Sequence, residues 1–281
     1  MTRIVTDSNS QIPPALVERY GITVVPLTVT VDGQPYAEGV DLDADEFWRR
    51  FEAGTPEVST SQPSSGRFAA AYDRLVAEGA DEILSIHIGA SVSGTVNAAR
   101  LAAADVAVPV RIVDTGTASF GVALCTWAAA EVVDAGGTME DAVRAAEETA
   151  GGIGSVFVVR ALDLPRAGGR LAAGTPSAVA IPVLTMAGGR MEVVGEAADE
   201  RGVADVMAAH VRAWRQGDER LRVGVGVADA GVAHFWEALE ERLGDVAEVG
   251  EIVRYRVGPS VGVHTGPGTV GAMYAPIVRS R

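Results

Sequence analysis

The segment Ser91-Val92-Ser93-Gly94-Thr95 has the composition of an anion site and stands between a predicted strand and a predicted helix. The first N–H groups of a helix have no partner within the helix, and the helix dipole adds positive potential there. The hydroxyl groups of Ser93 and Thr95 could donate two further hydrogen bonds. Ser93, Gly94 and Thr95 are therefore candidates for binding a carboxylate or a phosphate.

Two other segments are similarly small and polar. Thr60-Ser61-Gln62-Pro63-Ser64 either belongs to such a site or forms the N-cap loop of the next helix, because Ser and Thr favour that position. The run from Gly258 to Gly268 is expected to be a glycine-rich loop that contains His264 and Thr265, where backbone can approach a ligand closely. An imidazole can donate to an anion, and it titrates near physiological pH. His210 and His234 fall in helical patterns and are expected to be surface or packing residues.

Particular residues of the sequence argue against several other kinds of catalytic or binding site. The stretch from Gly89 to Ser93 misses a nucleophile elbow, which needs Gly where Ser93 stands. The stretch from Gly224 to Asp229 lacks the third glycine of a dinucleotide-binding fingerprint. No Cys or His pair has zinc-ligand spacing, so no metal site is expected. All 23 basic residues are Arg, which excludes a lysine Schiff base.

The composition sets limits on ligands and surroundings. A formal net charge of −14 opposes binding to nucleic acid or to anionic lipid headgroups. Aromatic residues make up only 5%, so the core and any pocket should be aliphatic. The one cysteine, Cys125, lies in an apolar stretch and should be a core residue. With no signal peptide and no apolar run long enough to span a membrane, the chain is expected to be cytoplasmic.

Predicted strands and helices alternate along the chain on either side of these segments. This alternation predicts an α/β fold with a Rossmann-like parallel sheet in the N-terminal half. A strand is expected at Ile22 to Val31 before an Asp32-Gly33 hairpin turn, and a polar loop at Val58 to Ser65. The other strands expected in this half are 3–5, 82–88 and 110–113, and the helices are 13–20, 43–51, 66–78, 96–104, a long helix ending at 134, and 139–150.

The C-terminal half reads as a second α/β domain with a mixed sheet. We expect domains at 1–152 and 153–281, divided at a glycine-rich stretch. The strands expected here are 155–159, 180–184, 191–194, 221–227 and 246–253, with helices at 203–215 and 233–243.

The chain resembles the DegV family over nearly its whole length. The resemblance rests on six motifs in the same order: Ile4-Val5-Thr6-Asp7-Ser8, Thr60-Ser61-Gln62-Pro63-Ser64, Ser91-Val92-Ser93-Gly94-Thr95, Val113-Asp114-Thr115, Gly168-Gly169-Arg170, and Gly258 to Gly268. This family includes the fatty-acid-binding subunits of bacterial fatty acid kinase. The resemblance implies a two-domain fold of the DegV type, with an acyl chain at or near the domain interface.

The resemblance also implies roles for single residues. Thr60 or Ser61, together with Ser93, would bind the carboxylate of a long-chain fatty acid, which is the ligand in place of any cofactor. Arg170 and His264, with Thr265 and Arg201 nearby, would lie where a partner kinase adds phosphate from ATP to form an acyl phosphate for phospholipid metabolism. The chain itself would then be a lipid-binding carrier and not an enzyme.

This sequence departs from the family pattern in two places. The stretch around Arg166 replaces a more basic segment, and the stretch around Arg201 is more acidic than expected. Two other functions stay open: an esterase or acyltransferase that uses Ser93 with His264, and a non-catalytic regulator that senses lipid.

Overall fold

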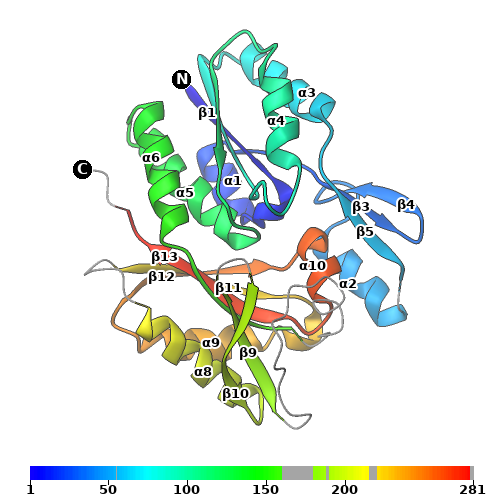
Figure 1. Cartoon of the computed structure of the whole chain (residues 1–281), viewed down its shortest axis with the longest axis vertical. Helices are drawn as coiled ribbons and strands as arrows, with labels where there is room; N and C mark the ends of the chain where they lie inside the picture. The colour runs from blue at the N-terminus through cyan, green and yellow to red at the C-terminus, as the bar shows by residue number, and fades with distance from the viewer. Residues whose placement is uncertain (55, 160–179, 188–189, 215–219, 279–281) are drawn as a thin grey trace. The chain divides into compact units, whose positions relative to one another are not determined.

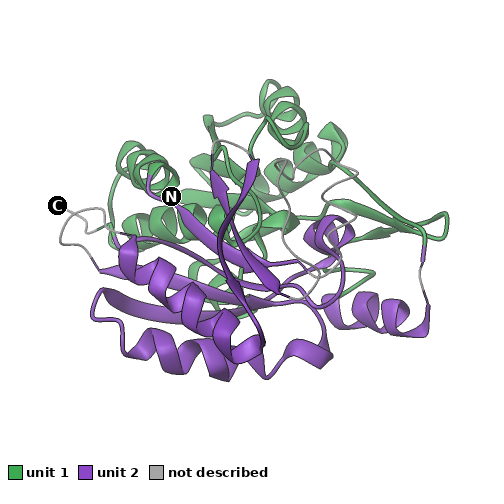
Figure 2. Ribbon diagram, turned by 60° about the horizontal axis from the view of Figure 1, so that its bottom comes forward, with its two compact units in different colours: residues 1–43, 57–151, 278–281 green, residues 44–56, 152–277 purple. Residues whose placement is uncertain are grey.

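The computed structural model describes every residue except 55, 160–179, 188–189, 215–219 and 279–281. The chain divides into two compact units, coloured separately in Figure 2. Unit 1 comprises residues 1–43, 57–151 and 278–281, and unit 2 comprises residues 44–56 and 152–277. The expected first domain, 1–152, differs from unit 1 because residues 44–56 belong to unit 2.

Unit 1 is built on a four-stranded parallel sheet with strand order β2-β1-β6-β7. Strand residues alternate between the two faces, so Val5 and Ile83 face one side and Thr6 and Ile86 the other. Helices α3 and α4 cover the Val5 face, and α1, α5 and α6 cover the opposite face (Figure 1). The elements are β1 (Thr2–Asp7), β2 (Thr23–Val25), β6 (Glu82–His87), β7 (Val110–Asp114), α1 (Pro14–Tyr20), α3 (Ser65–Ala77), α4 (Thr95–Ala103), α5 (Phe120–Asp134), α6 (Met139–Gly151) and a short 3-10 helix, η1 (Ser8–Ser10).

A second, antiparallel sheet in unit 1 corrects two sequence-based predictions. The strand expected at Ile22 to Val31 is two strands, because β2 ends at Val25 and β3 (Thr28–Val31) pairs elsewhere. The loop expected at Val58 to Ser65 is wrong: β5 (Val58–Ser61) pairs with β3, and α3 begins at Ser65. The third strand of this sheet, β4 (Gln34–Ala37), follows the expected turn at Asp32-Gly33.

Helix α5 forms the centre of unit 1, since nearly all of its residues are buried. Cys125 lies in this helix and is fully buried, and burial raises the pKa of its thiol to about 12. The thiolate needed for nucleophilic chemistry is therefore disfavoured. Cys125 is a core residue, as its apolar surroundings in the sequence predict.

Unit 2 contains a six-stranded mixed sheet with strand order β10-β9-β8-β13-β11-β12. Only β11 and β12 run parallel, and the other neighbours are antiparallel. Helices α8 and α9 bury an aliphatic face against this sheet. The elements are β8 (Gly154–Val158), β9 (Ile181–Ala187), β10 (Arg190–Ala197), β11 (Leu221–Val227), β12 (Val249–Arg256), β13 (Val270–Pro276), α2 (Ala44–Ala53), α8 (Glu200–Ala213), α9 (Phe235–Gly244), α10 (Pro259–Thr265) and η2 (Ala230–Val232).

The run from Gly258 to Gly268 is not a loop, which corrects the prediction made for it. It contains helix α10, and the glycine at its centre serves packing: a Cβ on Gly262 would lie 2.7 Å from the Trp48 ring and 2.8 Å from the Phe47 ring. The Trp48 indole N–H also donates to the Val257 carbonyl at 2.8 Å. Strand β13, which follows, was not expected from the sequence.

The fold thus agrees with the α/β class predicted, with a parallel N-terminal sheet and a mixed C-terminal sheet. No helix in the described part of the chain is both long and apolar enough to cross a membrane.

Candidate functional site

The strand order of unit 1 marks where a ligand should bind. From β1 the chain goes to β2 on one side and to β6 on the other, so the order reverses between β1 and β6. In open α/β sheets ligands bind at the carboxyl ends of the strands that flank such a reversal. The segment 88–95 follows β6 directly and therefore lies at this edge.

Two of the predicted residues in this segment share a hydrogen bond. Ser93 Oγ and Thr95 Oγ1 are 2.8 Å apart, and the Thr95 N–H points at Ser93 Oγ at 3.3 Å. Only one of the two hydroxyl protons can lie between the two oxygens, so the other remains to donate to a ligand. Ser93 is half-buried and Thr95 is buried, at the N-terminus of α4 with Gly94 in the N-cap position. This corner can thus offer a hydroxyl donor beside the N–H groups in the first turn of α4, which have no acceptor within the helix.

The second predicted segment, Thr60 to Ser64, directly contacts the N-terminus of α4. A Cβ on Gly94 would overlap the side-chain amide of Gln62, so that amide packs directly against the Gly94 backbone. The segments containing Thr60 and Ser93 are therefore brought together within unit 1. Ser64 has another role, because its hydroxyl accepts a hydrogen bond from the Arg67 N–H at 3.3 Å and caps α3.

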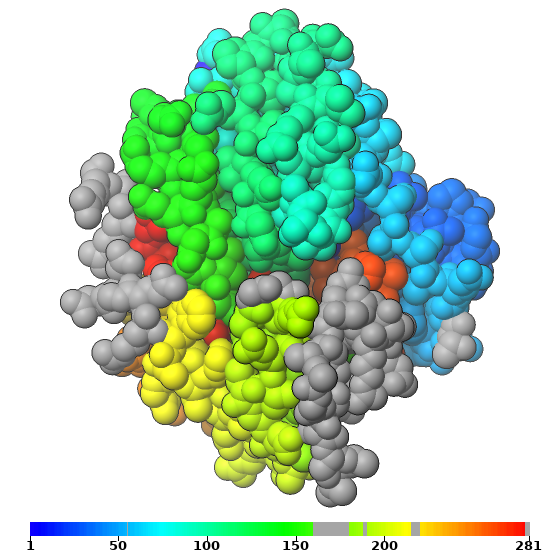
Figure 3. All heavy atoms as spheres, in the orientation of Figure 1, coloured from blue at the N-terminus to red at the C-terminus, as the bar shows by residue number. Residues whose placement is uncertain are grey.

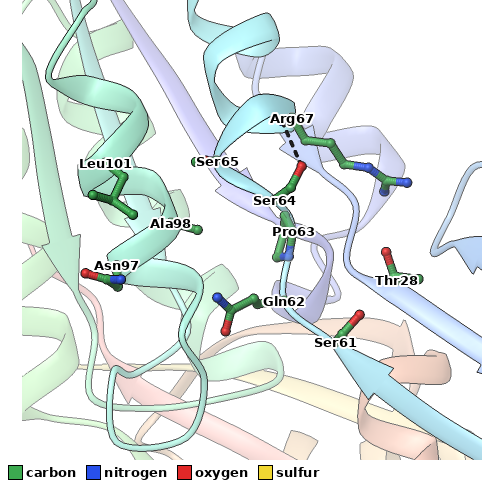
Figure 4. Close-up of a pocket in the computed structure, with 10 residues that line it drawn as sticks. All are labelled: Thr28, Ser61, Gln62, Pro63, Ser64, Ser65, Arg67, Asn97, Ala98 and Leu101. Carbon is green, nitrogen blue, oxygen red and sulfur yellow. Dashed lines mark hydrogen bonds between the residues drawn. The ribbon is translucent and has the colours of Figure 1, made fainter.

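Thr60 and Ser61 face opposite sides of β5, because side chains alternate along a strand. Thr60 stands opposite Val29, which is fully buried, and Ser61 stands opposite Thr28. The Ser61 hydroxyl lines an open cavity of about 460 Å³, drawn in Figure 4, where the Gln62 side chain extends toward α4. The cavity is lined by Thr28, Ser61, Gln62, Pro63, Ser64, Ser65, Arg67, Asn97, Ala98 and Leu101.

This cavity is mostly polar and does not include Ser93 or Thr95 in its lining. Leu101 is 61% exposed, and the helix that carries it, α4, lies at the surface of unit 1 seen in Figure 3. Such a lining does not suit a long apolar chain. Thr60, on the other face of β5, does not line this cavity.

The residues expected on the phosphate side lie elsewhere in the chain. His264 is exposed in the last turn of α10, with Thr265 following it, and Thr265 Oγ1 donates to the Val261 carbonyl at 3.3 Å. Arg201 is exposed in the first turn of α8, next to Glu200, whose carboxylate lies 2.6 Å from His234 Nε2. All of these belong to unit 2. Arg170 and Arg166 lie outside the described residues.

One constellation was missed by the reasoning from sequence. Asp7, Ser85 and His87 lie at the carboxyl half of β1 and β6, and Tyr72 of α3 joins them. All four side chains are fully buried. The signal was present in the sequence, since Ser85 and His87 interrupt the apolar residues that follow Glu82 in β6 and lie two apart on one face.

The geometry gives little support to a serine esterase. The hydroxyl of Ser93 is bonded to Thr95, and the hydrogen bond between Ser85 and His87 lies inside the core, away from Ser93. Among the residues that the structure describes, no cluster of three or more His, Cys, Asp or Glu could hold a metal ion.

Comparison with known proteins identifies the family. The family model described as "Uncharacterised protein, DegV family" matches residues 1–276. A DegV domain-containing protein of Streptomyces coelicolor is 38% identical over 275 residues, or 96% of each chain. One from Deinococcus radiodurans is 35% identical over 280 residues, or 98% of each chain.

Solved structures agree with this assignment. A fatty-acid-binding DegV family protein from Thermus thermophilus matches with a TM-score of 0.85 and 33% identity, covering 98% of this chain and 99% of its own. A DegV lipid-binding protein from Thermotoga maritima matches with a TM-score of 0.86 and 27% identity, covering 99% of both chains. From its fold and its sequence, this chain belongs to the DegV family.

Proposed function

We propose that this chain binds a long-chain fatty acid and holds its carboxylate at the corner formed by β5 and the N-terminus of α4. The residues assigned to the carboxylate are Ser93, Gly94 and Thr95, with Thr60 or Ser61 from β5. The observation that carries the proposal is the contact of Gln62 with Gly94, which brings two hydroxyl-bearing segments together at the sheet edge where ligands bind. The fatty-acid-binding relative from Thermus thermophilus supports the same ligand.

The energetics explain why a compact donor cluster is needed. Each buried methylene of an acyl chain contributes about 0.8 kcal/mol, so a long chain gains roughly 10 kcal/mol before ordering costs. A carboxylate buried without donors would cancel several kcal/mol of this gain. The Ser93–Thr95 hydroxyl pair and the N–H groups in the first turn of α4 offset that cost.

The substitution Ser93→Ala tests this assignment. It removes the Ser93–Thr95 hydrogen bond and one donor, so we expect fatty acid binding to weaken by about 1–3 kcal/mol. The measurement is titration of the delipidated protein with oleate, with Ser91→Ala as the control for an exposed serine of the same segment. Equal affinities of Ser93→Ala and Ser91→Ala would show that Ser93 has no part in binding.

We further propose that the bound acid is presented to a partner kinase. The kinase would transfer the terminal phosphoryl group of ATP to a carboxylate oxygen, forming an acyl phosphate and releasing ADP. His264 supports this role because it is exposed at the end of α10, and Arg170, Thr265 and Arg201 are assigned with it to the phosphate side. Arg suits phosphate because its planar fork donates two hydrogen bonds at once.

Substitution on the phosphate side should separate binding from presentation. We expect His264→Ala and Arg170→Ala to retain fatty acid but to lose acyl-phosphate formation with a cognate fatty acid kinase. Retained lipid and kinase-dependent phosphorylation are measured on the same preparations. Loss of both activities together would contradict this division. A wild-type chain that binds lipid but is never phosphorylated would instead favour the lipid-sensing regulator.

A further inference from the structure

The buried polar side chains of unit 1 form one continuous chain of hydrogen bonds. Tyr72 Oη lies 2.8 Å from Ser85 Oγ, Ser85 Oγ lies 2.7 Å from His87 Nε2, and His87 Nδ1 lies 2.9 Å from Asp7 Oδ2. All four side chains have no exposed surface, and the Phe68 ring packs edge-on against the imidazole with centroids 5.0 Å apart. Nothing in the proposed lipid chemistry uses these groups directly.

The direction of this chain follows from its acceptor end. The Asp7 carboxylate accepts from the Asn9 N–H through Oδ1 and from the Ile88 N–H through Oδ2, both at 3.1 Å. An ionised carboxylate only accepts, so the proton between Asp7 and His87 belongs to Nδ1. In a neutral imidazole Nε2 then accepts from the Ser85 hydroxyl, and Ser85 accepts from Tyr72. Burial raises the pKa of Tyr72 to about 12, so this phenol keeps its proton at neutral pH.

This arrangement satisfies every member of the chain. The Nε2–H tautomer of His87 would donate to Ser85, and Ser85 would then donate to Tyr72. The Tyr72 proton would be left buried without an acceptor, which costs free energy. The Nδ1–H tautomer of His87 is therefore the one that these hydrogen bonds favour.

Asp7 connects this chain to the loops at the ligand-binding edge. The Ile88 N–H that Asp7 accepts is the first peptide group after β6. The next residue, Gly89, accepts hydrogen bonds through its carbonyl from Val92 N at 2.9 Å and from Ser93 N at 3.1 Å. The position of Ser93 is thus set from Asp7 through two consecutive residues, Ile88 and Gly89.

A second branch reaches the N-terminus of α5. Asn9, whose N–H is held by Asp7, accepts the Ser119 N–H through its side chain at 2.8 Å. Ser119 has φ 57° and ψ −145°, a conformation that costs a non-glycine residue free energy and persists only where neighbours impose it. The Thr115 hydroxyl also donates to the His87 carbonyl at 2.8 Å. The ends of β1, β6 and β7 are therefore fixed relative to one another through Asp7 and His87.

We propose that Asp7 and His87 are positioning residues that hold the loop 88–95 in the conformation that binds the fatty acid carboxylate, with Tyr72 and Ser85 fixing the tautomer of His87. This inference rests on the proposed function of Ser93. It assigns no catalytic step to the buried serine, since Ser85 has no exposed surface.

The tautomer of the His87 imidazole can be measured directly. It would not depend on Asp7 if Asp7 and His87 only filled space in the core. In ¹H–¹⁵N correlation spectra of the imidazole nitrogens at neutral pH, we expect the Nδ1–H form in the wild-type protein. The protein has four histidines, so the signal that disappears in His87→Gln is assigned to His87. In Asp7→Asn the amide offers a donor, and His87 should change to the Nε2–H form. A wild-type His87 in the Nε2–H form would overturn the proposed direction of the hydrogen bonds from Tyr72 to Asp7.

The effect on the loop is measured on the same variants. We expect amide hydrogen exchange at residues 88–95 of the lipid-free protein, and the dissociation constant for oleate, each to rise about tenfold or more in Asp7→Asn and His87→Gln. Tyr72→Phe keeps the ring in the core and should change both in the same direction by less. Thr126→Val is the matched control, because it removes a buried hydrogen bond to the Val122 carbonyl on the opposite face of the same sheet.

The outcomes separate this inference from the proposed function. Exchange in 88–95 that rises no more than in Thr126→Val would overturn the positioning role. Selective loosening of 88–95 without any oleate binding by the wild-type protein would support the positioning role and refute the proposed ligand. Asp7→Asn is tested alongside Tyr72→Phe so that a variant that fails to fold still leaves a decisive comparison.

Discussion

Thr60 and Ser61, two adjacent candidates for the carboxylate site, lie on opposite faces of β5. From the sequence, the hydroxyls of both residues are candidates for binding the carboxylate. The segment was expected to be a loop, and in a loop either side chain can face a ligand. In β5 they face opposite sides, Thr60 with the buried Val29 and Ser61 with the polar cavity. Only a long-range pairing with β3 determines this, and single residues do not reveal it.

The matched substitutions Thr60→Val and Ser61→Ala test this choice. We expect Thr60→Val to weaken oleate binding by about 1 kcal/mol or more, since it removes a hydroxyl from the buried face while keeping the shape of the side chain. Ser61→Ala should leave the affinity within about 0.5 kcal/mol of the wild type, as for other surface substitutions. Calorimetric titration of both variants gives the answer, and the reverse order would place the carboxylate in the cavity of Figure 4.

Most strands and helices could be predicted from periodicity and turn residues, and two of the exceptions share one cause. β5 is polar and was expected as a loop, yet the hairpin of β3 and β4 offers it a free edge. Helix α10 is glycine-rich and was expected as a loop, yet Gly262 is required by aromatic rings more than 200 residues earlier in the chain. In both cases tertiary contacts override local propensity.

The packing of α10 predicts a clear difference between two glycine substitutions in unit 2. Gly262→Ala places a methyl group against buried rings and should destabilise unit 2 by about 1–3 kcal/mol through overpacking. Gly244→Ala, at the end of α9, meets no atom within 4 Å and should be neutral or slightly stabilising. Chemical denaturation followed by tryptophan fluorescence measures both, with Trp48 as a reporter beside α10. Equal stabilities would mean that α10 does not pack tightly on α2.

At the scale of the whole molecule, the fold class and the family could be predicted from the sequence, while the units could be placed only in part. The glycine-rich stretch near residue 152 marks the change between units, but the return of 44–56 to unit 2 has no local signal. The position of Ser93 and Thr95 before a helix could be predicted from the sequence, and their role in binding stays a prediction. The contact between Asp7 and His87, which are 80 residues apart, was not predicted.

We propose that this chain carries one fatty acid with its carboxylate at Ser93. Native mass spectrometry of the purified protein, before and after delipidation and addition of oleate, tests this proposal. We expect a single acyl adduct per chain that is lost on delipidation, returns with oleate at one equivalent, and is reduced in Ser93→Ala. A folded wild-type chain that shows no acyl adduct at any oleate concentration would contradict it.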